Sequence, residues 1–342
     1  METKRYTVNQ IEQAAAALNA GELVSFPTET VYGLGADATN PAAVKKVYAA
    51  KGRPSDNPLI VHVASVETVE HYAVTSNPAF GQLVKAFWPG SLTIILPLKH
   101  GAFDAVVTGG LKTAAFRLPD NQVTLSLIKA AGVPIVGPSA NTSGKPSPTL
   151  ADHVLHDLTG KIAGVIDDGP TGVGLESTVI DLSVATPVIL RPGVVTQEAI
   201  ERVIGPIMTN KHKVGAAETP KAPGMKYKHY APNAQVYIVA NPDDFDAAID
   251  WASQQAVPFG VMAVDTILEK QAKVRFKDQF SLGESVVTAS QHLFEGLRYF
   301  DLNPEVKLIL VQGFAKEGVG LAYMNRLEKS AGQKYFSKQQ AD

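Results

Sequence analysis

The sequence predicts an α/β protein with a larger and a smaller domain. Up to about residue 206, short apolar strand patterns mix with amphipathic helix patterns without strict alternation, which favours a mixed sheet (α+β) over a doubly wound one. Beyond residue 235, strand and helix patterns alternate regularly, as in a small three-layer domain with a parallel sheet. A length of 342 residues suits this division, because one domain usually contains about 100–200 residues.

Each element of the larger domain is predicted from a local apolar pattern. Residues 8–20 are expected to form an amphipathic helix, with apolar residues from Ile11 to Leu18 at helical spacing and Gly21 ending it. The other helices are predicted at 41–50, 79–87, 122–131 and 195–204. The strands are predicted at 23–26, 59–63, 92–97, 113–117, 133–136, 178–182 and 188–190.

The smaller domain follows a segment that has no periodic apolar pattern. Its predicted strands are 236–240, 258–264 and 306–313, and its predicted helices are 243–254, 284–299 and 320–331. The preceding segment is predicted to be a linker, and its composition alone would suit a solvated spacer. Its aromatic residues and prolines argue against a merely flexible tether. The predicted domains are therefore 1–206, a linker at 207–234, and 235–342.

Composition excludes several classes of protein. With 45% hydrophobic and 19% charged residues, the chain can bury cores and is not disordered throughout. The absence of cysteine removes thiolate nucleophiles, cysteine zinc sites, iron–sulfur clusters and disulfides. The 31 basic and 33 acidic side chains give no general attraction to nucleic acid, so a polyanion would need a local cluster. Without a signal-peptide pattern or a long apolar run, we expect a soluble, cytoplasmic protein.

Two motifs place polar side chains two residues apart. Lys51 and Arg53 precede Asn57, and in extended backbone both cations would face one anion, such as a polyphosphate. The alternative is a helix C-terminus, where cations favour the negative end of the helix dipole. Ser139 and Asn141 follow a buried-looking strand, and ligands of α/β folds usually lie beyond the carboxyl ends of strands. An ordinary Asn-Thr-Ser-Gly turn is the alternative here.

Side chains at other strand ends are weaker signals. The hydroxyl groups of Thr28, Thr30 and Tyr32 follow a strand and are placed to hydrogen-bond a small polar ligand. Arg117 and Arg191 each end an apolar strand, where a lone cation suggests recognition of a carboxylate or phosphate. The sequence contains no Walker loop, nucleophile elbow or histidine cluster. A site of Lys, Arg, Ser, Thr and Asn works by positioning and charge neutralisation, which suits transfer at phosphorus.

Ordered blocks of sequence carry a family resemblance. The blocks are FPTETVYGLG (26–35), KGRPSDNPLIVHV (51–63), WPGSLTIILP (88–97), FRLPDN (116–121), GPSANTSGKPSPT (137–149), ESTVIDL (176–182) and LRPG (190–193). Together they strongly resemble the YrdC-like catalytic domain of the threonylcarbamoyl-AMP synthase family. Residues 222–232 and 320–331 resemble the linker and C-terminal domain of the long two-domain form.

The resemblance implies a fold and a reaction. The fold would be a twisted mixed sheet with a large concave, cationic cavity, joined to a small Rossmann-like domain. The reaction would convert L-threonine, bicarbonate and ATP into threonylcarbamoyl-AMP and pyrophosphate. The product would pass to a tRNA threonylcarbamoyl transferase complex, which modifies the adenosine beside the anticodon of ANN-decoding tRNAs. Contact with tRNA would then be indirect or weak, and no membrane is involved.

The resemblance also implies roles for individual residues. The catalytic tetrad would be Lys51, Arg53, Ser139 and Asn141. ATP would contact Lys51, Arg53, Asn57, Thr113, Ser139, Asn141, Ser147, Arg191 and Tyr230, and L-threonine would contact Thr28, His62, Arg117 and Ser177. Tyr230 and Lys228 lie in the linker, which would fold over the site as a lid. Mg²⁺ is expected as the counter-ion of ATP, and no acidic pair identifies a protein ligand for it.

Two other readings compete with the synthase. An RNA-binding module would also use a cationic surface, but it predicts clusters of basic and aromatic residues that the near-neutral catalytic region lacks. A hydrogenase-maturation factor that uses carbamoyl phosphate also contains a YrdC-like domain. That family requires zinc-finger segments, which a chain without cysteine excludes.

Overall fold

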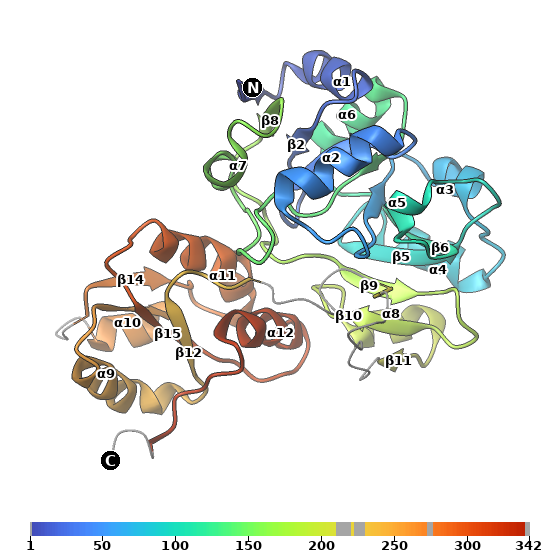
Figure 1. The fold of residues 1–342 in the computed structure, drawn as a ribbon. Helices are drawn as coiled ribbons and strands as arrows, with labels where there is room; N and C mark the ends of the chain where they lie inside the picture. The colour runs from blue at the N-terminus through green and yellow to red at the C-terminus, as the bar shows by residue number, and fades with distance from the viewer. Residues whose placement is uncertain (1, 210–219, 222–229, 272–275, 339–342) are drawn as a thin grey trace. The chain divides into compact units, whose positions relative to one another are not determined.

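The computed structural model describes residues 2–209, 220–221, 230–271 and 276–338, which form two compact units (Figure 1). The first unit comprises Met1–Ser143, Ser147–Gly172 and Glu176–Tyr227, and the second comprises Gly144–Pro146, Val173–Leu175 and Lys228–Asp342. Most of the predicted linker, including Lys228, lies outside the described residues. The division into 1–206, 207–234 and 235–342 therefore stays a prediction.

The first unit is built on one mixed sheet. Its strands are β1 (Lys4–Thr7), β2 (Val24–Phe26), β3 (Gly33–Asp37), β4 (Ile60–His62), β5 (Leu92–Pro97), β6 (Thr113–Arg117), β7 (Ile135–Val136), β8 (Gly164–Asp167), β9 (Thr178–Asp181), β10 (Val188–Arg191) and β11 (Met208–Thr209). They pair in the order β1-β8-β2-β3-β7-β4-β6-β5-β9-β10-β11. Because β4 is parallel to β6 and antiparallel to β7, the predicted mixed sheet is confirmed.

Helices of this unit bury apolar side chains against the sheet. They are α1 (Ile11–Asn19), α2 (Pro41–Lys51), α3 (Val66–Tyr72), α4 (Pro78–Phe87), α5 (Ala105–Thr108), α6 (Gln122–Ala131), α7 (Ala151–Leu158) and α8 (Gln197–Ile204). The pair α1 and α6 packs side by side and shares a core with β2, which includes Leu18, Leu127 and Phe26 (Figure 1). A larger core joins α2, α4 and α8 to the central strands.

Strand alternation gives the central strands a second, more polar face. Ile60, Ile95, Ala115 and Val179 form a small buried cluster that belongs to β4, β5, β6 and β9. Side chains two residues apart on a strand share a face, so polar residues at that spacing lie on the same face as this cluster. These residues are His62, Thr93, Thr113, Arg117 and Ser177. The sheet thereby gathers side chains from distant parts of the sequence.

Glycines in β3 explain why the sequence did not predict this strand. Gly33 and Gly35 lie against the ring of Phe26 in the neighbouring strand, and a Cβ on Gly33 would lie 2.5 Å from the Phe26 Cζ. Such a strand has no side-chain alternation to detect, because the glycines leave room for the ring. The short elements β1, β8, β11, α3, α5 and α7 were also not predicted.

The second unit contains a parallel sheet, as predicted, but with four strands instead of the predicted three. Its strands are β12 (Gln235–Val239), β13 (Phe259–Ala263), β14 (Asp278–Ser281) and β15 (Leu308–Gln312), in the order β12-β15-β13-β14. Its helical elements are η1 (Pro242–Asp244), α9 (Phe245–Gln254), α10 (Asp265–Gln271), α11 (Val286–Asp301) and α12 (Val319–Ala331). Strand β14 and helix α10 were not predicted from the sequence. Within the described residues, none of the helices is both long and apolar enough to cross a bilayer.

A glycine beside the polar face provides a test of this packing. A Cβ on Gly137 would lie 2.6 Å from both His62 Nδ1 and Phe26 Cζ, so Gly137→Ala should destabilise the first unit by about 1–3 kcal/mol. Gly81→Ala is the matched control, because its Cβ would meet nothing within 4 Å and alanine suits a helix. Urea unfolding measures both variants. Equal stability of the Gly137→Ala variant and the wild type would contradict the packing described.

Candidate active site

Lys51 crosses from the end of α2 to the loop that follows β7. Asn40 caps the start of this helix, and Gly52 ends it in the left-handed region with φ 63°. Lys51 is 2% exposed, and its Nζ donates hydrogen bonds of 2.5 Å to the carbonyl oxygens of Ser139 and Asn141. Lys51 ends a helix, so the alternative of a helix C-terminus is confirmed and the expectation of extended backbone at Lys51 was wrong. Three members of the predicted tetrad, Lys51, Ser139 and Asn141, nevertheless lie in contact.

Arg53 and Asn57 lie on the turn between α2 and β4. The Arg53 guanidinium donates to the carbonyl oxygens of Asn57 and Pro58, at 3.3 and 3.1 Å from Nη2. The Asn57 Oδ1 is buried without a hydrogen-bond partner, which is an unfavourable state for an acceptor. Nearby, burial raises the pKa of the Tyr48 phenol to about 12, so this hydroxyl stays protonated and donates to Val106.

Ser139 and Asn141 are joined side chain to side chain. The Ser139 hydroxyl donates to Asn141 Oδ1 at 2.5 Å, and the Asn141 amide donates to the Thr142 carbonyl at 2.8 Å. Gly33 pairs with Ser139 across an isolated bridge, so the loop after β7 lies beside β3. Asn141 is buried, and the chain turns directly after it at Ser143 and Gly144, so the site role of Ser139 and Asn141 stays a prediction.

Arg117 ends β6 and is buried beside an acidic residue. Its Nη1 donates to Thr30 Oγ1 at 2.8 Å, its Nε donates to the Gly90 carbonyl at 3.3 Å, and its Nη2 lies 2.6 Å from Glu29 Oε1. The hydroxyl groups of Thr30 and Thr28 are 2.8 Å apart, and Thr28 donates onward to the Val31 carbonyl. The loop after β2 thus holds Arg117. Sequence reasoning missed Glu29, although a buried cation implies an anionic partner.

His62 ends β4, directly beside Arg117 in the sheet register. Burial and then the charge of Arg117 hold the pKa of the His62 imidazole well below its usual value, and a backbone hydrogen bond at Ile60 partly offsets this. The imidazole is therefore neutral near pH 7. Its Nδ1 has no hydrogen-bond partner and is buried, as is Arg117 Nη2. Two neighbouring polar side chains thus retain unused hydrogen-bonding capacity.

Ser177 connects the polar face to β10. Its hydroxyl lies 2.7 Å from Thr93 Oγ1 and accepts a hydrogen bond of 3.1 Å from Arg191 Nη2. Glu176 directly precedes Ser177 in the chain, and its Oε1 accepts a hydrogen bond of 2.5 Å from the Ser147 hydroxyl. The sequence did not predict the contact between Glu176 and Ser147.

The remaining predicted residues are Thr113, Tyr32 and Tyr230, none of which takes part in the contacts described above. Thr113 begins β6, at the opposite end of the strand from Arg117. Tyr32 was expected to offer its hydroxyl to a ligand, but that hydroxyl donates to the Gly169 carbonyl and accepts from the Asp168 N–H, so this expectation was wrong. Tyr230 belongs to the second unit, where its ring packs 5.1 Å from that of Phe294. Its assignment to ATP stays a prediction.

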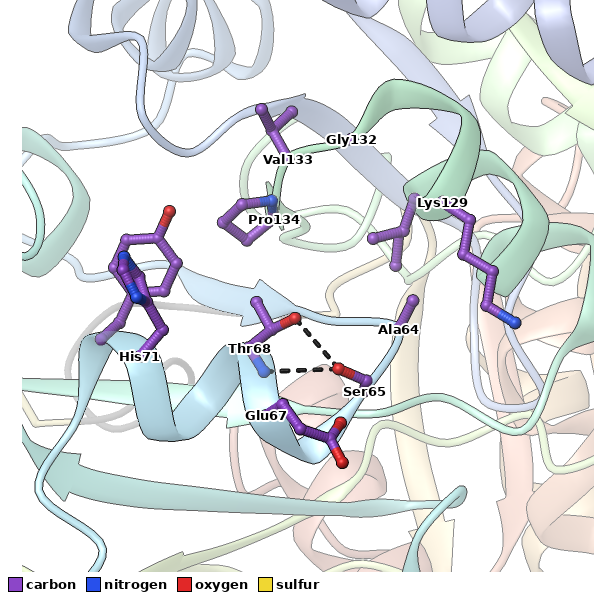
Figure 2. A pocket seen from close by; sticks show the side chains of 11 residues that line it. Ala64, Ser65, Glu67, Thr68, His71, Lys129, Gly132, Val133 and Pro134 are labelled. Atoms are coloured by element: carbon purple, nitrogen blue, oxygen red, sulfur yellow. Dashed lines mark hydrogen bonds between the residues drawn. The ribbon is translucent and has the colours of Figure 1, made fainter.

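A surface pocket of about 470 Å³ lies between α3 and the end of α6, lined by residues that include Thr68, Lys129 and Pro134 (Figure 2). The Ser65 hydroxyl in this pocket accepts a hydrogen bond from the Thr68 N–H and caps α3. None of the predicted site residues lines the pocket. We therefore give it no part in the active site.

Comparisons with known proteins identify the family of the chain. Residues 16–193 match the Sua5, YciO and YrdC family, described as telomere recombination, and residues 195–332 match the C-terminal domain of threonylcarbamoyl-AMP synthase. The threonylcarbamoyl-AMP synthase of Bacillus subtilis is 49% identical over 346 residues, which cover 97% of this chain and 99% of the relative. That of Pyrococcus abyssi is 45% identical over 329 residues, covering 94% of each.

Solved structures extend the comparison to the fold. Pyrococcus abyssi Sua5 complexed with L-threonine superposes with a TM-score of 0.90 at 43% identity over 98% of both chains. A variant of that protein, with a His and a Tyr replaced by alanine, also gives 0.90 over 98% of both chains. The fold, with its buried Lys51 and Arg117, is that of a YrdC-like α/β enzyme. The chain belongs to the threonylcarbamoyl-AMP synthase family, with both the catalytic and the C-terminal regions of that family.

The depressed pKa of His62 predicts a pH dependence of stability. The unfolded imidazole has a pKa near 6.5, so below this pH the unfolded state binds more protons and the folded state loses stability. Between pH 6.5 and 5.5 the wild type should lose about 1 kcal/mol more unfolding free energy than His62→Asn. Urea unfolding at both pH values measures this difference.

The exposed His100 provides the matched control, because His100→Asn should keep the wild-type slope between the same pH values. If His62→Asn and wild type have parallel slopes, the folded imidazole of His62 is not held neutral by its surroundings.

Proposed function

We propose that this protein makes L-threonylcarbamoyl-AMP and pyrophosphate from L-threonine, bicarbonate and ATP. Full-length relatives carry the name of this synthase, and the similar Pyrococcus abyssi protein has been solved with L-threonine. The observation that carries the proposal in this chain is the convergence of Lys51 on the loop of Ser139 and Asn141, at 2.5 Å from both carbonyl oxygens. A buried cation beside a Ser–Asn pair suits the phosphates of a nucleotide.

The ATP side of the proposed site follows from these groups. We assign Lys51, Arg53, Asn57, Thr113, Ser139, Asn141, Ser147, Arg191 and Tyr230 to ATP. The amine of L-threonine and bicarbonate would first form N-carboxythreonine, with loss of water. A carbamate oxygen of N-carboxythreonine would then attack the α-phosphorus, and the bond to the bridging oxygen of pyrophosphate would break. Lys51 and Arg53 would stabilise the charge that grows on the phosphate oxygens.

Magnesium would neutralise charge on the ATP phosphates. A magnesium ion in such sites keeps several waters and is bound largely by the phosphates of the substrate. The described residues contain no group of three acidic or histidine side chains suited to a metal. We therefore assign no protein ligand to it.

The residues proposed for L-threonine lie around Arg117. His62 pairs with Arg117 in the sheet register, and the hydroxyl of Thr28 contacts Thr30, which accepts a hydrogen bond from Arg117. We assign Thr28, His62, Arg117 and Ser177 to L-threonine, with Arg117 as the partner of its carboxylate. The hydrogen bond from Arg191 to Ser177 places residues of the two assigned sets in contact. Substrates held by adjoining side chains react with a smaller loss of entropy at the transition state.

The product would leave for a second enzyme. We propose that it passes to the tRNA threonylcarbamoyl transferase complex, which would attach the group beside the anticodon, so contact of this protein with tRNA would be indirect. The expected lid role of the linker, its contact to ATP through Tyr230, and a cytoplasmic location belong to the same proposal. Closure would protect the labile carbamate from water.

The reaction itself can be tested directly. Incubation of the protein with ATP, Mg²⁺, bicarbonate and L-threonine should release pyrophosphate and yield a nucleotide with the mass of threonylcarbamoyl-AMP. Release should require both L-threonine and bicarbonate, because both enter the product. Pyrophosphate release that continues when either is omitted contradicts the proposed reaction.

Replacement of Lys51 tests its assigned role. Lys51→Ala should lower kcat about 100-fold or more, because a cation that stabilises transition-state charge is lost. Lys45→Ala is the matched control, since Lys45 lies exposed on the same helix. Steady-state pyrophosphate release measures both variants. Full activity of Lys51→Ala would remove the phosphate role of Lys51 and leave the overall reaction standing.

A further inference from the structure

The guanidinium of Arg117 is held from several directions by groups outside β6. Thr30 Oγ1 accepts from Nη1 at 2.8 Å, the Gly90 carbonyl accepts from Nε at 3.3 Å, and Glu29 Oε1 lies 2.6 Å from Nη2. The Arg117 residue is 4% exposed. An arginine restrained in this way cannot sample other rotamers without losing buried interactions, so its orientation is fixed before any ligand arrives.

Glu29 is anchored as firmly as the arginine it contacts. The Ser91 hydroxyl donates to Oε1 at 3.0 Å, and the backbone N–H of Asp120 donates to Oε2 at 3.2 Å. The side chain of Glu29 is 13% exposed. These two contacts come from segments outside β6, so Glu29 forms a rigid support rather than a mobile counter-ion.

One nitrogen of Arg117 remains available in spite of this restraint. Nη2 is buried and has no hydrogen-bond partner, although it lies close enough to Glu29 for an ion pair. The contact with Glu29 therefore provides charge balance without aligning the N–H groups of Nη2 on the carboxylate. Unused buried donors are unfavourable, so a donor left in this state indicates a place for an acceptor.

The ion pair also determines which anion suits Arg117. A lone buried guanidinium would attract any anion by its net charge, including the phosphates of a nucleotide. Paired with Glu29, the site has no net charge and carries an anionic oxygen beside the cation. A polyanion is then repelled by Glu29, whereas a single carboxylate gains directed hydrogen bonds from Nη2.

We propose that Glu29 is a positioning residue that sets Arg117 for the carboxylate of the amino-acid substrate. Glu29 acts through Arg117, fixing its orientation and balancing its charge, and does not itself touch the reacting atoms. This inference rests on the proposed function, because it takes L-threonine as the ligand of Arg117.

The test compares L-threonine with L-threoninol, which lacks the carboxylate. Calorimetric titration of the full chain should show that Glu29→Gln weakens L-threonine binding about 10-fold or more and leaves the weaker binding of L-threoninol unchanged. A merely structural role would weaken both ligands alike. Unchanged or tighter L-threonine binding by Glu29→Gln overturns the inference.

Matched variants keep the outcome interpretable. Glu22→Gln removes a carboxylate from the surface pair with Lys46 and should bind both ligands as the wild type does. If Glu29→Gln does not fold, Ser91→Ala removes one support of Glu29 and should weaken only L-threonine binding, about 2- to 3-fold. Equal binding by Ser91→Ala and wild type overturns the inference in that case. If the wild-type protein binds no L-threonine, the proposed function is overturned together with the inference. If the wild type binds L-threonine and Glu29→Gln binds it equally well, only the inference about Glu29 fails.

Discussion

The site depends on one constraint, which is that a buried positive charge must be paired. Lys51 and Arg117 are 2% and 4% exposed, and neither finds its partner in its own segment. Lys51 finds carbonyl oxygens in the loop after β7, and Arg117 finds Glu29 in the loop after β2. Because removal of one partner from a buried pair is strongly destabilising, these interactions join the loops to the sheet and give the site its shape.

The alternation of side chains along the strands supplies the second requirement. His62 on β4, Arg117 on β6 and Ser177 just before β9 lie on one face of the sheet, although they are far apart in sequence. The opposite side chains of the same strands, such as Val61 and Phe116, belong to the main apolar core. The same strands therefore stabilise the fold with one face and provide polar groups with the other. The chemistry of the family requires little more than this, because nucleotidyl transfer relies on positioning and charge neutralisation.

Local patterns predicted much of this fold, and the failures have physical causes. Strands 92–97 and 113–117 were predicted at the observed bounds, because their apolar runs are unambiguous. Strand β3 escaped prediction because its glycines make room for Phe26. Of the site, the single cations were identified, but the pairing of Arg117 with Glu29 joins residues 88 positions apart through the sheet topology (117 − 29). No local sequence pattern indicates which distant residues become neighbours in the sheet. The role expected for Tyr32 was wrong for the same reason, because its hydroxyl bonds the backbone of Asp168 and Gly169, which are distant in sequence.

A crystal structure of the protein with L-threonine would show whether the pair of Arg117 and Glu29 receives the ligand. We expect a carboxylate oxygen of L-threonine within hydrogen-bond distance of Arg117 Nη2, while Glu29 keeps its contacts with Arg117, Ser91 and Asp120. A ligand carboxylate bound elsewhere, or an Arg117 that leaves Glu29 to reach the ligand, would show that the pair does not position Arg117 for L-threonine.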